Sequence, residues 1–453
     1  MKIKKNAKYN GIVCSLTDVK PHPNADRLQV ARALGYDVVV GLEAKEGDLG
    51  ICFPEGGKLS HEMCLHNSLY RKDPVTGEKM GGYFGENGRV KSTKLRGVHS
   101  EAFFTSLDSL VWAGQRGFVE LKEGTEIGEI DGQKICEKYY TRATLRAMNR
   151  AKKNYKKPKW LPKFLVPIHK KYVVNKVKRD PCPDFKKHFS TTKLRQYSHM
   201  IPEGLNAIIT SKMHGTSGRT GYVKYDTRRF LGRLLKRPVK YQYVTGTRNV
   251  VKNPIGYGES KDDGYYAGTT FRQRCHSIIQ SAGLYKDEVV YYEIVGFESE
   301  GKPIMPNHKL DWKDFKDSGF SKKEFQQLVD QFSETITYHY GQEDGECEIR
   351  VYRITNKNVD LSDQKMRQRC QELGLQCVSK LTEIDSGEDL MGICKDLSEE
   401  SDMQGQLREG VCVRLEDLEG KLVKIVKYKS NRFAILEGIK RNDVDYVDME
   451  EIN

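Results

Sequence analysis

The sequence predicts an α+β protein in which a small N-terminal β-barrel precedes a larger domain of antiparallel sheets. The chain has 453 residues, which is too long for one typical domain. Residues 1–125 contain short strand-like runs, whereas strand-like and helix-like runs alternate from about residue 185 onward. Hydrophobic residues make up 38% of the chain, enough for a core. The sequence has no run of about 18 apolar residues, so no membrane span is expected.

The first 125 residues read as five or six short β-strands. Their apolar, β-branched runs are separated by Gly, Pro, Asn or Asp, and a polar, glycine-rich stretch at 65–88 reads as a long loop. Short strands joined by turns are typical of a small closed barrel. The predicted strands are GIVCSLTDV (11–19), DRLQVARAL (26–34), YDVVVGL (36–42), GDLGICF (47–53), GRVKSTKL (88–95) and EAFFTSL (101–107).

Residues 126–184 are predicted to be a basic linker. The chain carries 76 Lys and Arg against 62 Asp and Glu, and residues 141–179 hold fourteen of these basic residues and no acidic one, so the rest of the chain is neutral. Such a block attracts a polyanion, and its aromatic side chains can stack on unpaired bases. A solvated linker is the alternative interpretation. The candidate nucleic-acid contacts here are Lys152, Lys153, Lys156 and Lys157.

From residue 185 the pattern predicts strands and helices in alternation, with no internal repeat. Strands of this order, linked by turns and single helices, favour largely antiparallel sheets. The predicted strands are NAIITSKM (206–213), VKYQYVTGT (239–247), EVVYYEIVGF (288–297), CEIRVYRIT (347–355), GVCVRLED (410–417) and KLVKIVKYK (421–429). The predicted helices are TFRQRCHSIIQSAGL (270–284), SKKEFQQLVDQFSETI (321–336) and SDQKMRQRCQELGL (362–375).

Lys212 is the first candidate for chemistry, because it ends a strand-like run and precedes a tight polar turn, MHGTS. Gly215 in this turn allows the close backbone approach that a phosphate-binding turn needs. A lysine shielded from water near other cations can lose its proton and act as a nucleophile. Each unit by which its pKa falls from about 10.4 costs roughly 1.4 kcal/mol. Taken alone, the pattern could equally be a surface turn.

The order of the motifs that follow Lys212 indicates a catalytic role for this lysine. The run KMHGTS resembles motif I of the covalent nucleotidyltransferase superfamily of ATP-dependent ligases and capping enzymes, and its HG pair is more typical of RNA ligases than of DNA ligases. Further motifs follow in the family's order across residues 212–429. They offer Arg248 after motif I, Glu293 in motif III, Tyr352 in motif IIIa, Glu409 in motif IV, and Lys427 and Lys429 in motif V.

The resemblance implies that Lys212 attacks the α-phosphate of ATP and forms a lysyl–AMP intermediate. Lys427 and Lys429 alternate along a strand, so they share a face and would neutralise that phosphate. Glu409 would hold Mg²⁺ or Mn²⁺, directly or through water.

The resemblance implies roles for five other residues as well. Glu293 would bind the ribose or a metal-bound water, Tyr352 would stack on adenine, and His214 would support the end-joining steps. Arg219, two residues after the KMHGTS run, would join Arg248 in binding phosphate through a planar guanidinium. Each of these side chains could instead be structural, as a buried ion pair, a core aromatic ring or a solvated arginine.

The sequence departs from the family at three places, and one of them is Arg353 at the end of motif IIIa, where an aspartate is common in related RNA ligases. Ser211 stands where an acidic residue often precedes the nucleophile. The interval before Arg248 is longer than in compact ligases, and residues 226–243 read as an inserted basic loop of unassigned role.

HPNADRL and KLRGVHSE in the N-terminal region resemble the OB-fold tRNA-binding modules of aminoacyl-tRNA synthetases, and also the N-terminal OB module of the fifth RNA ligase family. The resemblance implies an OB-fold nucleic-acid-binding module at 1–125 and a nucleotidyltransferase domain at 185–453. An OB barrel binds single strands on one face, and the candidates here are Lys91, Lys94 and Arg96. A solvated strand face is the alternative.

The function predicted from these observations is ATP-dependent joining of 3′-hydroxyl and 5′-phosphate RNA ends. The expected substrates are nicks in duplexes, in which the RNA is paired with RNA or with DNA, or broken tRNA. The alternatives are a non-catalytic RNA-binding protein, a DNA ligase and a capping guanylyltransferase. Eleven cysteines without a CxxC pair favour a reducing compartment over a disulfide or zinc framework. A reducing compartment indicates the cytoplasm. We also expect a monomer, encoded by a cell or by a virus.

Overall fold

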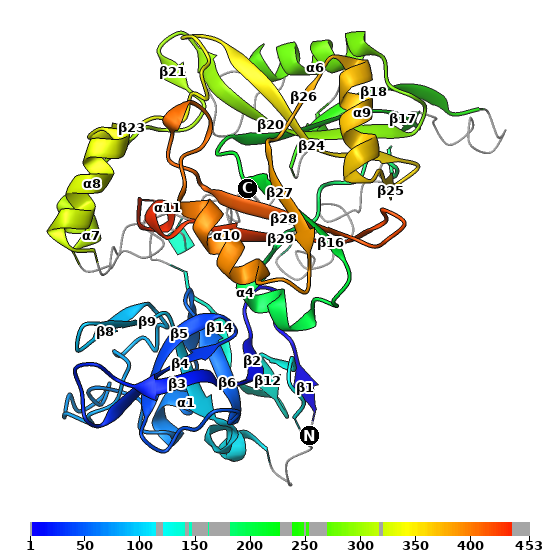
Figure 1. Ribbon diagram of the computed structural model, residues 1–453. Helices are drawn as coiled ribbons and strands as arrows, with labels where there is room; N and C mark the ends of the chain where they lie inside the picture. Colours follow the sequence, from blue (N-terminus) through cyan, green and yellow to red (C-terminus); the bar gives the residue numbers. More distant parts are fainter. Residues whose placement is uncertain are drawn as a thin grey trace.

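The computed structural model describes residues 2–114, 121–140, 145–146, 162, 182–226, 238–248, 251–252, 270–316 and 320–436. Within these residues the protein is a mixed α+β structure whose sheets are largely antiparallel, as the sequence predicts. Figure 1 shows the N-terminal strands as a separate unit beside a larger unit that contains two sheets. None of the helices in the described part is long and apolar enough to cross a membrane.

The N-terminal unit contains two main sheets, with strand orders β10-β6-β2-β11 and β3-β4-β5. Pairing continues past the predicted boundary at residue 125, because β11 pairs with β2 and β14 pairs with β7. In residues 2–114 and 121–140 the strands form separate sheets and no closed barrel, so the OB fold stays a prediction. The elements are β1 (Ile3–Lys4), β2 (Gly11–Ser15), β3 (Thr17–Pro21), β4 (Leu28–Ala33), β5 (Tyr36–Gly41), β6 (Leu49–Pro54), β7 (Gly57–Leu59), α1 (His61–His66), β8 (Thr93–Leu95), β9 (Val98–Ser100), β10 (Ala102–Ser106), η1 (Leu107–Ala113), β11 (Glu126–Ile127), β12 (Glu129–Ile130), β13 (Gln133–Lys134) and β14 (Cys136–Lys138).

The first sheet of the larger unit runs β19-β18-β17-β20-β24-β25, with β21 and β26 attached at its margin. Helices α6 and α9 cover one face (Figure 1), where Phe271 and Met366 pack against Val290, Tyr292 and other apolar side chains. Because side chains alternate along a strand, Tyr291 and Glu293 face the opposite side. The elements are β17 (Thr216–Tyr225), β18 (Lys240–Thr247), β19 (Val251–Lys252), α6 (Thr270–Ala282), β20 (Glu288–Ser299), β21 (Lys302–Pro303), β24 (Cys347–Asn356), β25 (Val359–Asp360), α9 (Asp363–Leu373) and β26 (Gln376–Cys377).

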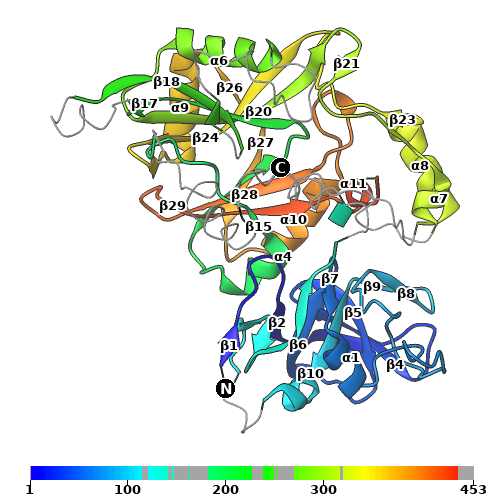
Figure 2. The same cartoon turned by 180° about the vertical axis from the view of Figure 1, so that it is seen from behind.

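The second sheet has the order β15-β29-β28-β16-β27 and is covered by α10 on one face. Leu390 and Cys394 of α10 pack with Val413, Val426 and Tyr428 in its core. Figure 2 shows α4 between this sheet and the N-terminal unit. The elements are β15 (Thr192–Lys193), α4 (Leu194–Tyr197), η4 (Ser198–Met200), β16 (Asn206–Ser211), β27 (Lys380–Asp385), α10 (Leu390–Glu399), η5 (Met403–Gly405), β28 (Gly410–Glu416) and β29 (Leu422–Lys429).

A third apolar cluster joins the end of the second sheet to a helical extension. Phe315 and Leu328 from this extension pack with Tyr338, Tyr340 and Phe433. The cluster lies directly beside the turn that follows β16, because Met213 belongs to it. Its elements are β22 (His308–Lys309), α7 (Trp312–Phe315), α8 (Lys322–Phe332), β23 (Thr335–Ile336) and α11 (Asn431–Leu436).

The predicted helices at 270–284, 321–336 and 362–375 are confirmed as α6, α8 and α9. Local chemistry explains two of the boundaries. Ser321 and Glu324 form a reciprocal capping box at the start of α8, and Gly374, in a left-handed conformation with φ 66°, ends α9.

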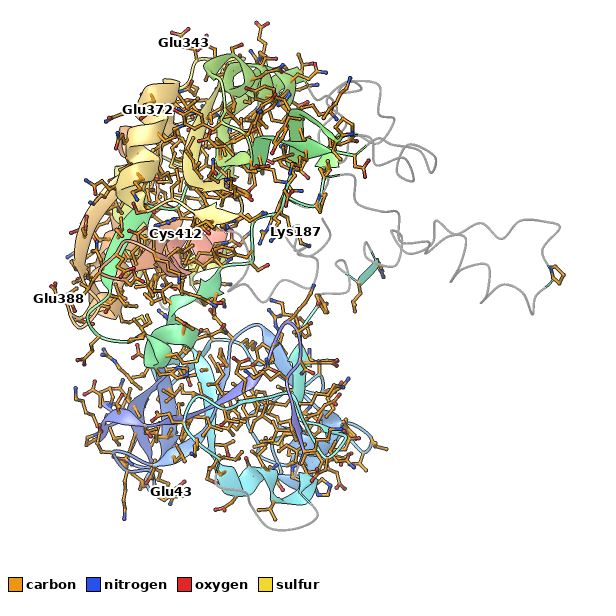
Figure 3. The ribbon with its side chains drawn as sticks, turned by 90° about the vertical axis from the view of Figure 1, so that its right-hand side faces the viewer. Glu43, Lys187, Glu343, Glu372, Glu388 and Cys412 are labelled. Carbon is orange, nitrogen blue, oxygen red and sulfur yellow. The ribbon has the colours of Figure 1, made fainter. Side chains whose placement is uncertain are left out.

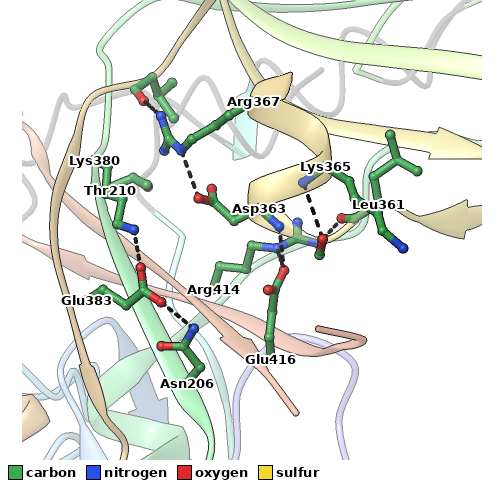
Figure 4. Close-up of polar contacts among 12 residues, drawn as sticks. Asn206, Thr210, Leu361, Asp363, Lys365, Arg367, Lys380, Glu383, Arg414 and Glu416 are labelled. Atoms are coloured by element: carbon green, nitrogen blue, oxygen red, sulfur yellow. Dashed lines mark hydrogen bonds and ion pairs between the residues drawn. The ribbon is translucent and has the colours of Figure 1, made fainter. Parts of the chain in front are cut away.

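A polar network ties the two sheets of the larger unit together (Figure 4). The Asp363 N–H donates to Glu416 Oε1 at 2.8 Å, and Arg414 also pairs with Glu416, so the start of α9 is bonded to β28. Partners of this kind offset the cost of burying charged groups. In the side view of Figure 3, Glu43 marks the N-terminal unit, Cys412 the level of the second sheet, and Glu372 the helix at the far end.

Candidate active site

Lys212 follows the last residue of β16, where this strand lies beside β28. Its backbone N–H donates to Gly410 O at 3.0 Å, which holds the start of the turn against the neighbouring strand. Its side chain is 19% exposed, and Nζ donates to Glu409 Oε1 at 2.5 Å. The lysine is therefore mostly shielded but reachable, as a nucleophile must be.

Glu409 is the carboxylate around which the cationic residues gather. Lys429 Nζ lies 3.4 Å from its Oε1, and His214 Nδ1 lies 3.5 Å from its Oε2. Only 3% of the Glu409 side chain is exposed. Burial would raise the pKa of Glu409, but Lys212, Lys429 and His214 outweigh it and hold the pKa well below its usual range.

Strand β29 presents Lys427 and Lys429 on the face opposite the α10 core, since Tyr428 between them is buried in that core. Lys427 pairs in register with Cys412 of β28 on one side and with Lys193 of β15 on the other. Lysines on adjacent strands in register repel each other unless an anion lies near them. This face is therefore suited to a phosphate.

The turn after Lys212 leads directly into the first sheet. Ser217 on β17 donates to Glu293 Oε2 at 2.9 Å, and the two residues pair in register. A Cβ at Gly215 would lie 2.4 Å from Ile294 O, so only glycine fits where the turn crosses β20. Burial raises the pKa of Glu293 to about 7, against the opposing effects of Lys212 and Ser217.

Arg272 also belongs to this region, and the sequence motifs did not point to it. Its Nη2 donates to Thr216 Oγ1 at 2.6 Å, and its Nη1 donates to Ser217 O at 3.1 Å. Arg272 is 7% exposed and comes from α6, which packs on the first sheet. In the sequence, Arg272 is visible only as an arginine within the predicted helix at 270–284.

His214 is enclosed by aromatic rings. Tyr338 and Phe433 contact its imidazole edge to face, each with ring centroids 4.7 Å apart. The backbone N–H of His214 donates to Tyr340 Oη at 2.8 Å. With Nδ1 directed at Glu409, the ring is fixed beside Lys212.

Tyr352 lies at a second, aromatic end of the site. The His188 ring meets it edge to face at 5.1 Å and stacks on Phe189 at 4.5 Å. Arg248 is close by, because its Nη2 reaches Ser190 Oγ at 3.5 Å. Burial, with the charges of Arg353 and Arg248, lowers the pKa of His188 to about 3, so this ring is neutral.

Arg219 and Ser211 take positions that the motifs alone could not assign. Arg219 is 3% exposed, and its guanidinium lies over the Phe185 ring, 4.5 Å from the centroid. The arginine is therefore packed against an aromatic ring. Ser211 Oγ donates to Asp402 Oδ2 at 2.6 Å. The carboxylate of Asp402, from a distant loop, thus lies beside Ser211.

The predicted nucleic-acid contacts lie either in the N-terminal unit or outside the residues that the structure describes. Lys91 precedes the β8–β9 hairpin of the N-terminal unit, and Arg96 is in its turn with φ 46°. Lys94 is a residue of β8, but its side chain lies outside what the structure describes. Also outside are Lys152, Lys153, Lys156 and Lys157, together with residues 227–237 of the predicted insertion.

The site therefore consists of a buried carboxylate, Glu409, in contact with two lysines, Lys212 and Lys429, in a two-sheet α+β unit with a β-rich unit before it. Solved structures with this architecture include those of an RNA ligase from Naegleria gruberi. The structure with PPi aligns with a TM-score of 0.54 at 12% identity, covering 94% of this chain and 98% of that one. A mutant with AMP and Mn aligns with a TM-score of 0.54 at 13% identity, covering 95% and 99%.

A further mutant of the same ligase, with ATP and Mn, aligns with a TM-score of 0.53 at 13% identity, covering 96% of this chain and 99% of that one. The chain therefore shares the fold of this RNA ligase over nearly its whole length. No family model matches the sequence. No curated protein matches it either.

Proposed function

We propose that the protein is an ATP-dependent RNA ligase that joins 3′-hydroxyl and 5′-phosphate ends through an AMP group carried on Lys212. The observation that supports this most directly is the contact of Lys212 with Glu409, with Lys429 also within 3.4 Å of that carboxylate. The shared fold with the Naegleria gruberi ligase, whose structures contain ATP, AMP, Mn and PPi, is the second support.

In the first step Lys212, having released its proton to solvent, attacks the α-phosphorus of ATP. A P–N bond forms as the P–O bond to pyrophosphate breaks, and pyrophosphate leaves with the electron pair. Lys427 and Lys429 stabilise the negative charge that develops on the α-phosphate oxygens. Tyr352 receives the adenine, and Arg248 beside it binds a phosphate or ribose oxygen.

Glu409 and Glu293 are the donors that fit a divalent metal ion. Their oxygens are hard ligands, and the charge of Glu409 adds to the effect of burial, which raises the pKa of Glu293. The described residues contain no group of three or more His, Cys, Asp or Glu that could hold a metal. This suits Mg²⁺ or Mn²⁺ held by few carboxylates together with water and phosphate oxygens, where the ion would neutralise phosphate charge.

In the second step the AMP moves from Lys212 to the 5′-phosphate of RNA, forming a phosphoanhydride as the P–N bond breaks. In the third step the 3′-hydroxyl attacks the 5′-phosphorus and AMP leaves. We assign the N-terminal unit, as an OB-type module with Lys91, Lys94 and Arg96, to holding the RNA ends. His214 supports these two steps from beside Lys212.

The test is incubation with ATP labelled at the α-phosphate in Mg²⁺ or Mn²⁺. The wild-type protein should acquire the label in an acid-labile, base-stable linkage, and Lys212→Ala should acquire none. Lys421→Ala is a matched control, because Lys421 is an exposed lysine in the connection between β28 and β29 and carries no AMP in this mechanism. Absence of label on the wild-type protein, with ATP and either metal, would contradict the proposal.

Nicked duplexes in which each terminal sugar is ribose or deoxyribose then identify the polymer. An RNA ligase should require a ribose at the 3′-hydroxyl end, whereas a DNA ligase would accept deoxyribose there. Labelling by GTP in place of ATP would indicate a capping enzyme. A protein that binds RNA but is labelled by neither nucleotide would be the non-catalytic alternative.

A further inference from the structure

Two thiols are in contact under the helices that cover the first sheet. Cys275 on α6 and Cys347, the first residue of β24, have their Sγ atoms 3.9 Å apart. Cys275 is 1% exposed in the apolar core beneath α6, whereas Cys347 is half-buried at the margin of this core. A disulfide bond is about 2.0 Å long, so the two sulfurs would need to approach each other by about 2 Å to form one.

The surroundings of Cys347 favour its thiolate form. The hydrogen bond from the Cys275 thiol and the positive charge of Arg274 lower the pKa of Cys347 against the opposing effect of burial. Arg274 is held nearby, because its Nη2 donates to Gly345 O at 3.1 Å. The same hydrogen bond, together with burial, raises the pKa of Cys275. A reachable thiolate beside a second thiol is the arrangement of a redox-sensitive cysteine pair.

The helix that carries Cys275 also supports the candidate active site. Arg272, three residues earlier on the same side of α6, donates its two hydrogen bonds to the start of β17. His276, the residue after Cys275, has its Nδ1 3.3 Å from Thr220 Oγ1 of the same strand. Because α6 is bonded to β17 on both sides of Cys275, a movement of this cysteine displaces those bonds.

The strand side of the thiol pair is held in place. Cys347 pairs in register with Gly296 of β20, and the Phe297 N–H donates to Glu346 O at 2.7 Å. A Cβ at Gly296 would lie 2.6 Å from Glu346 O, so these two backbones are already in close contact. The approach of the two sulfurs therefore falls mainly on α6. Hydrogen bonds weaken when the donor and acceptor move beyond about 3.2 Å, so the contacts of Arg272 would be lost first.

We propose that Cys275 and Cys347 form a reversible disulfide that slows the transfer of AMP to Lys212 by pulling α6 away from the start of β17. Formation of the disulfide goes beyond the proposed function and does not depend on it. Its effect on AMP transfer rests on the proposed function.

The oxidant in this step is a small-molecule disulfide, such as oxidised glutathione. The Cys347 thiolate attacks one of its sulfurs, so a mixed S–S bond forms, the S–S bond of the oxidant breaks and one small thiolate leaves. Cys275 then releases its proton and attacks the Cys347 sulfur, which expels the second small thiolate. The two protein thiols lose two electrons and two protons, and the oxidant is reduced to two small thiols.

The test treats the full chain with an excess of oxidised glutathione and then with dithiothreitol. Mass spectrometry of a non-reducing digest should find the peptides of Cys275 and Cys347 linked after the first step and separate after the second. Labelling by ATP carrying a labelled α-phosphate should slow by roughly tenfold on oxidation, as expected for lost hydrogen bonds, and should recover on reduction. Hydrogen exchange at the start of β17 should increase in the oxidised protein.

Cys347→Ser is the variant that removes the response. It should be labelled like wild type before treatment and should keep that rate in oxidised glutathione. Cys275→Ala should behave in the same way and serves as the second variant if Cys347→Ser folds poorly.

Cys377→Ser is the matched control. Cys370 on α9 and Cys377 on β26 are a second hydrogen-bonded thiol pair at the same core, but α9 is bonded to β28 through Asp363 and Glu416. The Cys377→Ser protein keeps the first pair and should slow on oxidation as wild type does.

Three outcomes would overturn the inference. One is a digest in which Cys347 carries glutathione and is not linked to Cys275. Another is a linked protein whose labelling and β17 exchange are unchanged. A third is a loss of labelling in oxidised Cys347→Ser, which would assign the response to another thiol, such as Cys412 beside Lys427. A reduced wild-type protein that takes no label would instead contradict the proposed function, and the digest and the exchange would still judge the disulfide.

Discussion

Glu409 and Glu293 are two carboxylates of one site whose surroundings shift their pKa values in opposite directions. Lys212, Lys429 and His214 outweigh the burial of Glu409 and lower its pKa, whereas burial dominates for Glu293 and raises its pKa to about 7. Environments that separate two carboxylates in this way are typical of catalytic sites. The separation also makes Glu293 a testable source of pH dependence.

We predict that Glu293→Gln gains stability relative to wild type as the pH rises. The carboxyl has a pKa of about 7 in the folded chain against an ordinary value of 4.5, so the folded protein binds this proton more tightly. Folding stability is therefore lost between pH 4.5 and about 7, by about 3 kcal/mol in full. Glutamine cannot ionise and avoids this loss. Urea unfolding at pH 5 and pH 8 measures the difference between the two proteins.

The exposed Glu62→Gln on α1 is the control for this measurement and should follow wild type at both pH values. Equal differences between Glu293→Gln and wild type at pH 5 and pH 8 would show that Glu293 is not buried as a neutral acid.

We predict that Arg272→Met slows transfer of AMP to Lys212 by roughly tenfold to a hundredfold. The substitution removes both hydrogen bonds to the turn at Thr216 and Ser217, and the loss of these bonds to half-buried acceptors costs about 1–3 kcal/mol. Single-turnover labelling with α-labelled ATP measures the rate. Arg274→Met, an exposed arginine on the same helix, should label at the wild-type rate. Equal rates for the two variants would contradict the assignment of Arg272 to this site.

The sequence could predict part of this site because its motifs occur in a fixed order. That order places Lys212, Glu409 and Lys429 in one region, and the structure brings them into contact, while their catalytic roles stay predictions. The order could not reveal Arg272, because its contact with the turn depends on how α6 packs on the sheet. Nor could it show that Arg219 is buried under Phe185, which depends on a segment that precedes β16 in the chain.

At the scale of elements, long periodic segments were predictable and irregular ones were not. Helices α6, α8 and α9 combine apolar periodicity with clear ends and were predicted. Strand β17 was missed because Gly218 and Gly221 weaken its pattern. The structure explains these glycines: a Cβ at Gly218 would lie 2.3 Å from the Tyr292 ring. The feature that hid the strand from sequence analysis is the one that lets it pair with β20.

We predict that Gly410→Ala prevents β28 and β29 from pairing correctly at the site. Gly410 has φ 152°, and a Cβ there would lie 2.2 Å from Tyr428 O, which the backbone of a paired strand cannot avoid. Stability should fall by about 3 kcal/mol or more, and labelling of Lys212 should be lost, because Gly410 O accepts the Lys212 N–H. Urea unfolding and labelling measure both effects.

Gly85→Ala is the control for Gly410→Ala, since nothing lies within 4 Å of a Cβ at Gly85. This variant should unfold and take label like wild type. A Gly410→Ala protein of wild-type stability would mean that the two strands are spaced differently at this position.

At the scale of the whole molecule, positive charge collects where the two units meet. Desolvation lowers the pKa of Lys193 to about 8; Glu55 opposes this shift, and Lys138 and Lys427 increase it. The junction between the N-terminal unit and β29 is thus already basic within the described residues. The sequence adds fourteen Lys or Arg at 141–179, in the interval between the two units.

We predict that the basic segment at 141–179 contributes much of the salt-dependent RNA affinity. Changing Lys152, Lys153, Lys156 and Lys157 together to Gln should make the plot of log affinity against log salt less steep, by roughly 0.7 for each single-strand phosphate that the segment no longer binds. Fluorescence anisotropy with a labelled RNA from about 50 to 200 mM salt measures the slope. Four exposed lysines of the larger unit, Lys302, Lys322, Lys323 and Lys395, changed to Gln together, are the charge-matched control. Because both variants have the same net charge, a general effect of charge would flatten both slopes equally, whereas a local contact flattens only the first.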